Sequence, residues 1–251
     1  MDSLSIGSRG LRSVRARFIL RKQNPLKTMA ASSESVDNYL KAILELSGPA
    51  AELVSSNALA ARLGVRAASV TGMLQKLASQ RPPLVIYRKH YGARLSPAGK
   101  RRAWEIVRHH RLLELFLHNV LNYPLDEVHE EAERLEHFIS ERFEDRVAAL
   151  LGDPRIDPHG HVIPEKYGAN SFSDEVSLLE WPVGEPATIR SVGDRDAAAL
   201  RELQRLALVP GVKVVVERRN PDSAVLVREV EGSQPIRVRN ELANLVLVAA
   251  L

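Results

Sequence analysis

The chain has 251 residues, a formal net charge of +4 and no cysteine. This length is enough for two or three domains with cores of their own, while the missing thiols exclude disulfides, thiolate zinc sites and cysteine nucleophiles. No apolar run reaches the roughly 18 residues of a transmembrane helix, so we expect no membrane partner.

The charges are distributed unevenly along the chain. Residues 1–28 carry seven basic side chains against one Asp, and we interpret residues 1–31 as a disordered basic tail, although the segment has the composition of a transit peptide and Met29 could be the true start. Residues 53–104 contain ten Arg or Lys and no Asp or Glu, whereas residues 105–150 contain eleven acidic side chains against five basic ones. The first block favours a polyanionic partner, and the second favours a cationic one.

The first predicted elements follow the order of a winged helix-turn-helix. Apolar periodicity predicts helices over about 35–46, 55–63 and 67–80, with a tight turn at "GVR" between the last two. The runs "LVIYRK" and "ARLS" within residues 84–96 then predict a β-hairpin. We assign residues 32–98 to this DNA-binding domain.

The third helix of this domain has the pattern of a recognition helix. Val70, Met73, Leu74 and Leu77 share one face, whereas small and polar residues point away and would let the helix enter a major groove. The alternative is a helical bundle with a solvated basic face, but such faces usually mix both signs of charge. The predicted DNA contacts are Arg66, Ser69, Thr71, Lys76, Arg88, Lys89 and Arg94.

Two later helices carry histidines and glutamates at helical spacing. In a helix over about 96–120, His110 and Glu114 lie within the apolar stripe, where a carboxylate needs a partner or a metal. One arc of a helix over about 126–150 carries His129, Glu133, Glu136 and His137. This nitrogen and oxygen set suits Mn(II), Fe(II), Co(II) or Zn(II). For the second helix alone, a solvated glutamate-rich face with incidental histidines is the alternative.

The remainder of the chain, after residue 150, has a different pattern of Pro, Gly and apolar residues. "GDPRIDPHGHVIPEKYG" is punctuated by Pro and Gly, and we interpret its histidines as loop residues rather than ligands. Residues 180–251 alternate like short strands around one helix, which predicts a small β-barrel. We therefore expect a mainly α fold with small β parts, in which residues 99–168 form a helical metal-binding and dimerisation domain before the barrel.

Together these segments resemble the DtxR/MntR family of metal-dependent transcriptional regulators. The resemblance begins at Ser35 and rests on "YLKAILEL", "LAARLGVRAASVTGMLQKL", "LSPAGKRRA", "VRHHRLLELFL", "VHEEAERLEHFIS" and "DPHGHVIP". The segment "LRELQRLALVPG" and its strands resemble the FeoA-like barrel of the family. The resemblance implies a cytoplasmic homodimer that is not an enzyme, binds a palindromic operator on double-stranded DNA, and controls metal-uptake genes, usually by repression.

The resemblance also implies two metal ions per subunit. The primary cluster would consist of Asn38, Glu133, Glu136 and His137, and the ancillary cluster of His110, Glu114 and His129. Because the set contains oxygen and nitrogen but no sulfur, Mn(II) is favoured as the cofactor and Fe(II) is the second candidate.

Three residues depart from the family pattern. Asn38 offers only a neutral carbonyl oxygen where relatives have Asp or Met, so Asp37 is an alternative ligand. Lys41 stands where manganese-type relatives have Glu, which argues against their closely spaced dinuclear centre. Asp194, in "SVGDRD", is a candidate ligand from the barrel, where some relatives supply two.

Two other classes of protein remain as alternatives. A di-metal carboxylate enzyme would need Glu-x-x-His on two helices, but Arg134 stands three residues before His137. A winged-helix regulator that responds to a non-metal ligand or a partner is the stronger alternative, and metal-dependent DNA binding would distinguish it.

Overall fold

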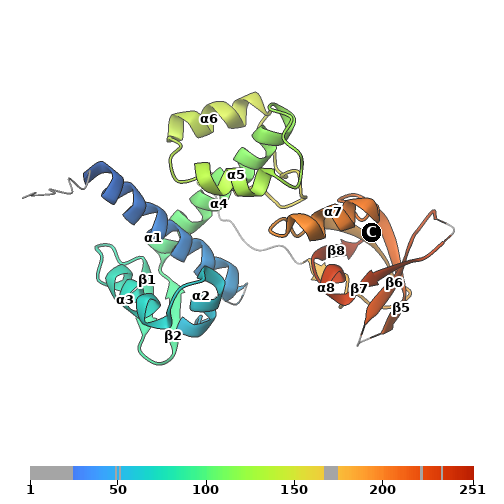
Figure 1. Cartoon of the computed structure of the whole chain (residues 1–251), viewed down its shortest axis with the longest axis horizontal. Coiled ribbons are helices and arrows are strands. Elements are labelled where there is room, and N and C mark those ends of the chain that lie inside the picture. Colours follow the sequence, from blue (N-terminus) through green and yellow to red (C-terminus); the bar gives the residue numbers. More distant parts are fainter. Residues whose placement is uncertain (1–24, 49, 51, 167–174, 221–222, 233) are drawn as a thin grey trace, which may run out of the picture.

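The computed structural model describes residues 25–48, 50, 52–166, 175–220, 223–232 and 234–251. Figure 1 shows three groups of elements along the chain: a winged helix-turn-helix, a helical region and a C-terminal sheet. Most of the tail predicted for residues 1–31 lies outside the described residues. The domain boundaries proposed from the sequence remain a prediction.

The N-terminal group consists of α1 (Pro25–Ser47), α2 (Ser56–Leu63), α3 (Ala67–Ala78), β1 (Val85–Arg88) and β2 (Gly92–Leu95). Ser55 caps α2 by accepting a hydrogen bond from the Ala58 N–H, and Gly64 ends α2 in the left-handed region at φ 65°. This turn directs α3 across α2. Val70, Leu74 and Leu77 of α3 are fully buried, which confirms the periodicity read from the sequence.

Helix α1 begins ten residues earlier than the predicted start at Ser35, so residues 25–31 lie in a helix rather than in the tail. Pro25 suits the first helical position because its fixed φ is already helical and its missing N–H would have no partner there. No Gly or Pro follows before Gly48, so nothing in this segment stops the helix.

The middle group contains α4 (Pro97–Asn119), α5 (Val128–Leu135) and α6 (Glu141–Leu150). Helix α4 belongs to two cores. Near its start Ala103 and Val107 pack in the core of the winged helix-turn-helix. Further along, Leu113 and Leu117 pack with α5, and Leu112 packs with α6.

The prediction of one helix over residues 126–150 was wrong. The structure has two helices, because Ser140 caps α6 by accepting a hydrogen bond from the Phe143 N–H at 3.3 Å. The break after α5 lets Glu136 turn inward, where its side chain is only 1% exposed. This part of the chain leaves several apolar side chains exposed: Val120, Leu121, Phe138, Phe143 and Leu150.

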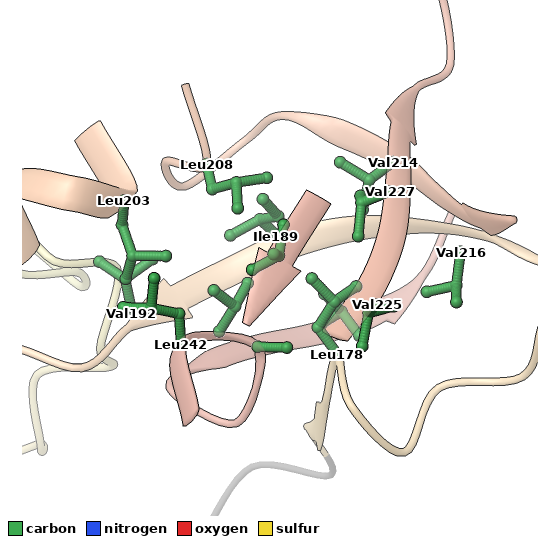
Figure 2. Packing of buried hydrophobic residues seen from close by; sticks show 14 of the residues in the cluster. Leu178, Ile189, Val192, Leu203, Leu208, Val214, Val216, Val225, Val227 and Leu242 are labelled. Atoms are coloured by element: carbon green, nitrogen blue, oxygen red, sulfur yellow. The ribbon is translucent and has the colours of Figure 1, made fainter. Parts of the chain in front are cut away.

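The C-terminal group is a curved antiparallel sheet with strand order β3-β8-β4-β5-β6-β7. Its elements are β3 (Val176–Ser177), β4 (Pro186–Val192), α7 (Ala197–Arg205), β5 (Lys213–Asn220), β6 (Ala224–Glu229), β7 (Ile236–Arg239), α8 (Asn240–Ala243) and β8 (Val246–Ala250). Leu203 of α7 and Leu242 of α8 belong to the same hydrophobic core as Ile189, Val214 and Val227 of the sheet (Figure 2). The fold is therefore mainly helical with small β parts, as the sequence predicts.

No helix in the described part of the chain is long and apolar enough to cross a membrane.

Glu144 joins α6 to α4 through buried charges. Its side chain is 1% exposed, accepts a hydrogen bond from Arg108 Nε at 2.5 Å, and lies 3.3 Å from His109 Nε2. Burial alone would raise the pKa of Glu144, but the hydrogen bonds from His109 and Arg108 outweigh it and lower the pKa to about 2. The ionised carboxylate therefore stabilises the folded state.

We expect Glu144→Gln to lower the free energy of unfolding at pH 7 by roughly 2–3 kcal/mol, because Arg108 and His109 lose their buried counter-charge. Since the pKa is lower in the folded state, this contribution is complete above pH 4.5 and is lost as the pH falls toward 2. Urea denaturation of both proteins from pH 7 down to about pH 3.5 should therefore show a shrinking difference. A difference that does not change with pH would contradict this assignment.

Candidate metal centre

The side chains singled out in the sequence meet where α1, α4 and α5 approach one another. Helical spacing places His110 and Glu114 on one face of α4, and His129 and Glu133 on one face of α5. His110 and Glu114 are 4% and 0% exposed. The loop after α5 then adds Glu136 and His137.

The predicted ancillary set forms a compact cluster. His110 Nε2 lies 3.0 Å from Glu114 Oε1 and 3.1 Å from His129 Nδ1, and His129 Nδ1 lies 3.2 Å from Glu114 Oε1. Atoms bound to one ion at about 2.1 Å are separated by about 3.0–3.6 Å. The spacing of these three side chains therefore fits a shared cation.

The charges within this cluster are strongly coupled. Burial lowers the pKa of His110, but the Glu114 carboxylate and hydrogen bonds to Glu114 and Glu136 raise it to about 10. Burial raises the pKa of Glu114, yet its charge and hydrogen-bond interactions with His110 hold it well below its usual value. A proton on His110 therefore compensates Glu114 without a metal, and a bound cation would have to displace it.

The C-terminal group, residues 175–251, which we call the barrel after the fold expected from the sequence, completes this cluster through Asp194, on the segment between β4 and α7. Asp194 Oδ2 lies 3.7 Å from His129 Nδ1 and 3.6 Å from His161 Nδ1. One ligand atom from each of His110, Glu114, His129 and Asp194 can be chosen so that all lie within 4.8 Å of one another. Asp194 was a loosely placed candidate in the sequence, and the structure brings it to the cluster.

The histidines of "DPHGHVIP" are in a loop, as interpreted from the sequence, but that interpretation missed their position beside the cluster. His159 is fully buried, its Nε2 lies 3.8 Å from Glu114 Oε1, and burial lowers its pKa. His161 Nδ1 lies 3.2 Å from Asp157 Oδ2. The sequence did contain one sign of this position, namely two histidines separated by a single glycine in a loop that contains Pro and Gly. No helical periodicity indicated where their side chains would point.

The predicted primary set lies next to this cluster, with one difference. His137 Nδ1 lies 3.5 Å from Asp37 Oδ2, and His137 Nε2 lies 3.4 Å from Glu136 Oε1. Asp37 is 3% exposed, so α1 brings a carboxylate, rather than only the amide of Asn38, to this position. Asn38 is half-buried on α1, and its role as a ligand remains a prediction. Glu133 is half-exposed at the rim.

Lys41 of α1 inserts its ammonium group among these side chains. Lys41 Nζ donates hydrogen bonds to Glu136 at 2.9 and 3.1 Å, and lies 3.3 Å from His110 Nδ1 and 3.5 Å from Glu133 Oε1. Its side chain is only 8% exposed. A fixed positive charge therefore occupies the boundary between the two sets, where it competes with a metal ion.

Several buried side-chain atoms at these sets have no hydrogen-bond partner among the described residues. They are Glu114 Oε2, His137 Nδ1, and both ring nitrogens of His159. Buried polar atoms normally have partners, and unpaired ones need an explanation such as an ion. Together with the oxygen and nitrogen donor set, they fit a hard or borderline divalent cation.

Six of the seven predicted DNA contacts are exposed on the winged helix-turn-helix. Arg66, Ser69 and Lys76 of the α3 segment are exposed, as are Arg88, Lys89 and Arg94 of the hairpin. Thr71 is half-buried, and its hydroxyl donates to the Ala67 carbonyl at 3.2 Å. A groove between the start of α3 and the hairpin tip is lined by Thr71, Lys89 and Tyr91, among others.

Comparisons with known proteins match this arrangement along the chain. Residues 32–93 match the family model of the iron dependent repressor N-terminal DNA binding domain, residues 96–165 that of the iron dependent repressor metal binding and dimerisation domain, and residues 176–250 the FeoA domain. The iron-dependent repressor IdeR of Mycobacterium leprae (strain TN) is 30% identical over 166 residues, which are 61% of this chain and 71% of that protein.

Solved structures of manganese-responsive proteins are also similar. A manganese-dependent transcriptional repressor in complex with manganese superposes with a TM-score of 0.78 at 33% identity, covering 86% of this chain and 100% of the other. The manganese regulator SloR gives a TM-score of 0.70 at 29% identity, covering 86% and 98%.

We expect Glu114→Gln to weaken Mn(II) binding at the cluster about tenfold to a hundredfold, because a neutral amide replaces a fully buried carboxylate. Isothermal titration of the metal-free protein would measure this. Glu217→Gln is the control, since Glu217 of β5 pairs with Arg228 and belongs to neither ligand set. Equal affinities for Glu114→Gln and the control would rule out Glu114 as a ligand.

Lys41→Met should have the opposite effect and tighten Mn(II) binding about tenfold or more, since it removes a buried positive charge beside the ligands. The same titration measures it, with Lys100→Met on the exposed side of α4 as the control. Weaker binding by Lys41→Met would indicate that the ammonium holds the ligands in place rather than opposing the cation.

Proposed function

Because this chain belongs to the family of metal-dependent transcriptional repressors that includes IdeR and the diphtheria toxin repressor, we propose that it senses Mn(II) and controls metal-uptake genes by binding a palindromic operator. Fe(II) is the second candidate metal. Members of this family are DNA-binding regulators rather than enzymes, and the matching domains indicate DNA and a second copy of the chain as partners.

The observation that carries the choice of a metal signal is the buried set of His110, Glu114, His129 and Asp194. These four side chains come from α4, α5 and the barrel, and a non-metal signal would leave their convergence without a purpose. The preference for Mn(II) rests on donor chemistry, because carboxylate and imidazole ligands suit Mn(II) and Fe(II), while a thiolate ligand is missing from a chain without cysteine.

The proposed mechanism begins with the cost of the buried carboxylates. In the metal-free protein, the proton on His110 and the ammonium of Lys41 compensate Glu114 and Glu136. When bound, divalent cations would neutralise the carboxylates and would be coordinated by side chains from α1, α4 and α5. Asp37 and His137 would then hold α1 to the α5 segment, and the position of α3 relative to the partner's α3 would be restricted.

Two recognition helices held at a fixed separation can engage two half-sites of a palindrome that are one helical turn, or a multiple of it, apart. The exposed apolar side chains of the middle group, among them Leu121, Phe138 and Leu150, are available for the subunit contact of the dimer. The predicted contacts from Arg66 to Arg94 would meet phosphates and base edges.

Fluorescence anisotropy on a labelled palindromic operator, taken from a metal-transporter promoter, tests this function. At fixed salt, we expect Mn(II) to tighten binding by the wild type at least tenfold, about 1.4 kcal/mol of coupling. Glu133→Ala/His137→Ala should not respond, because the primary set loses two donors. Glu130→Ala, on the exposed face of the same helix and paired with Arg134, should respond like the wild type.

Parallel titrations with Fe(II) and Zn(II) identify the preferred metal, and an operator reduced to one half-site tests the need for two recognition helices. If the wild type binds the palindrome equally with and without every metal, the sensor proposal is wrong, and the signal would have to be sought elsewhere in the chain.

A further inference from the structure

The barrel also contacts the DNA-binding part of the chain, through the residue that follows Asp194. Arg195 donates a hydrogen bond from Nη2 to Glu45 Oε1 of α1 at 2.5 Å. The other carboxylate oxygen of Glu45 accepts from Arg62 Nη2 of α2 at 2.9 Å. The Glu45 carboxylate thus connects the barrel to α1 and α2, the two helices that precede α3 in the sequence.

The surroundings make this bridge important for the relative position of the parts. A cavity of about 320 Å³ lies beside it, and its walls come from α1, α4, the histidine loop and the barrel. Apolar packing between the barrel and α1 is incomplete at this point, so side-chain bridges contribute more of the contact.

The barrel is attached to the middle group at separate points. The Val192 N–H donates to the His159 carbonyl at 3.0 Å, and Arg201 of α7 pairs with Asp126 before α5. Those contacts hold the barrel beside the metal cluster without touching α1. The Arg195–Glu45 bridge therefore has a different role from Arg201–Asp126.

We propose that Arg195 is a positioning residue that transmits the state of Asp194 to the winged helix-turn-helix. The two residues are adjacent in the chain, so fixing the Asp194 carboxylate at the cluster also fixes the backbone that carries Arg195. Arg195 then holds Glu45, and Glu45 holds Arg62 at the end of α2, one turn before the recognition helix. This inference rests on the proposed metal-dependent DNA binding and adds a second route to the one through Asp37 and His137.

The expected effect is moderate. The Arg195 side chain is 45% exposed and that of Glu45 is 28% exposed, so solvent screens the pair. Ion pairs of this kind change an equilibrium by at most about fivefold. The loss should appear in how much metal tightens DNA binding, and much less in how tightly metal binds.

The test compares the full-length wild type with Arg195→Met, Arg195→Lys and Arg201→Met. Operator affinity is measured by anisotropy with and without saturating Mn(II), and Mn(II) affinity by isothermal titration without DNA. Arg195→Met should reduce the metal-dependent tightening about threefold to fivefold while Mn(II) affinity changes by less than about twofold. Arg195→Lys should restore part of the response, and Arg201→Met, which loses the other barrel bridge, should respond like the wild type.

A double-mutant cycle distinguishes a direct bridge from general loosening. Arg195→Met/Glu45→Gln should respond no less than Glu45→Gln alone, because the second change removes a contact already lost. The inference is overturned if Arg195→Met responds fully to Mn(II), or if Arg201→Met loses as much as Arg195→Met. A wild type that ignores metal would overturn the proposed function and this inference together, so the two failures can be told apart.

Discussion

The burial of one carboxylate organises the junction of this protein. Glu114 is completely enclosed, and an uncompensated charge there would cost several kcal/mol. Three histidines from different parts of the chain offset that cost: His110 one turn earlier on the same helix, His129 on α5 and His159 in a loop. Asp194, near the barrel helix, adds a second negative charge to the same place. The parts are thereby brought together by a shared electrostatic requirement, and the same requirement makes the place receptive to a cation.

The ammonium group of Lys41 and the proton on His110 offset the cost of burying the carboxylates of Glu136 and Glu114. They allow the junction to remain folded when no metal is bound, since Glu136 and Glu114 each have a positive partner. A cation must therefore compete with the positive charges of Lys41 and His110, because the carboxylates of Glu136 and Glu114 are already neutralised. We expect such competition to lower affinity, which suits a sensor that should release its ion when the supply falls.

Helical periodicity carried the sequence-based prediction furthest. The i, i+4 spacing of His110 and Glu114 within an apolar stripe placed them correctly in the interior, and the acid-free block outlined the winged helix-turn-helix. Prediction failed where no period exists. The break at Ser140 depends on a single cap, β3 is only two residues long, and His159 reaches the cluster only because its loop folds back on α4. Contacts between distant segments leave little trace in one sequence.

Helix α4 has 23 residues, which corresponds to about 35 Å at 1.5 Å per residue. The first half of α4 lies in the core of the winged helix-turn-helix, and its second half lies in the core of the middle group. One continuous helix therefore connects the two parts rigidly. The winged helix-turn-helix is not joined to the middle group by a flexible linker. It can change its orientation only by small amounts, as α4 bends or α1 shifts against it. A homologous regulator that must read half-sites with a different separation would accordingly need a rebuilt subunit interface, because altering the ion or its ligands could not supply the extra reach.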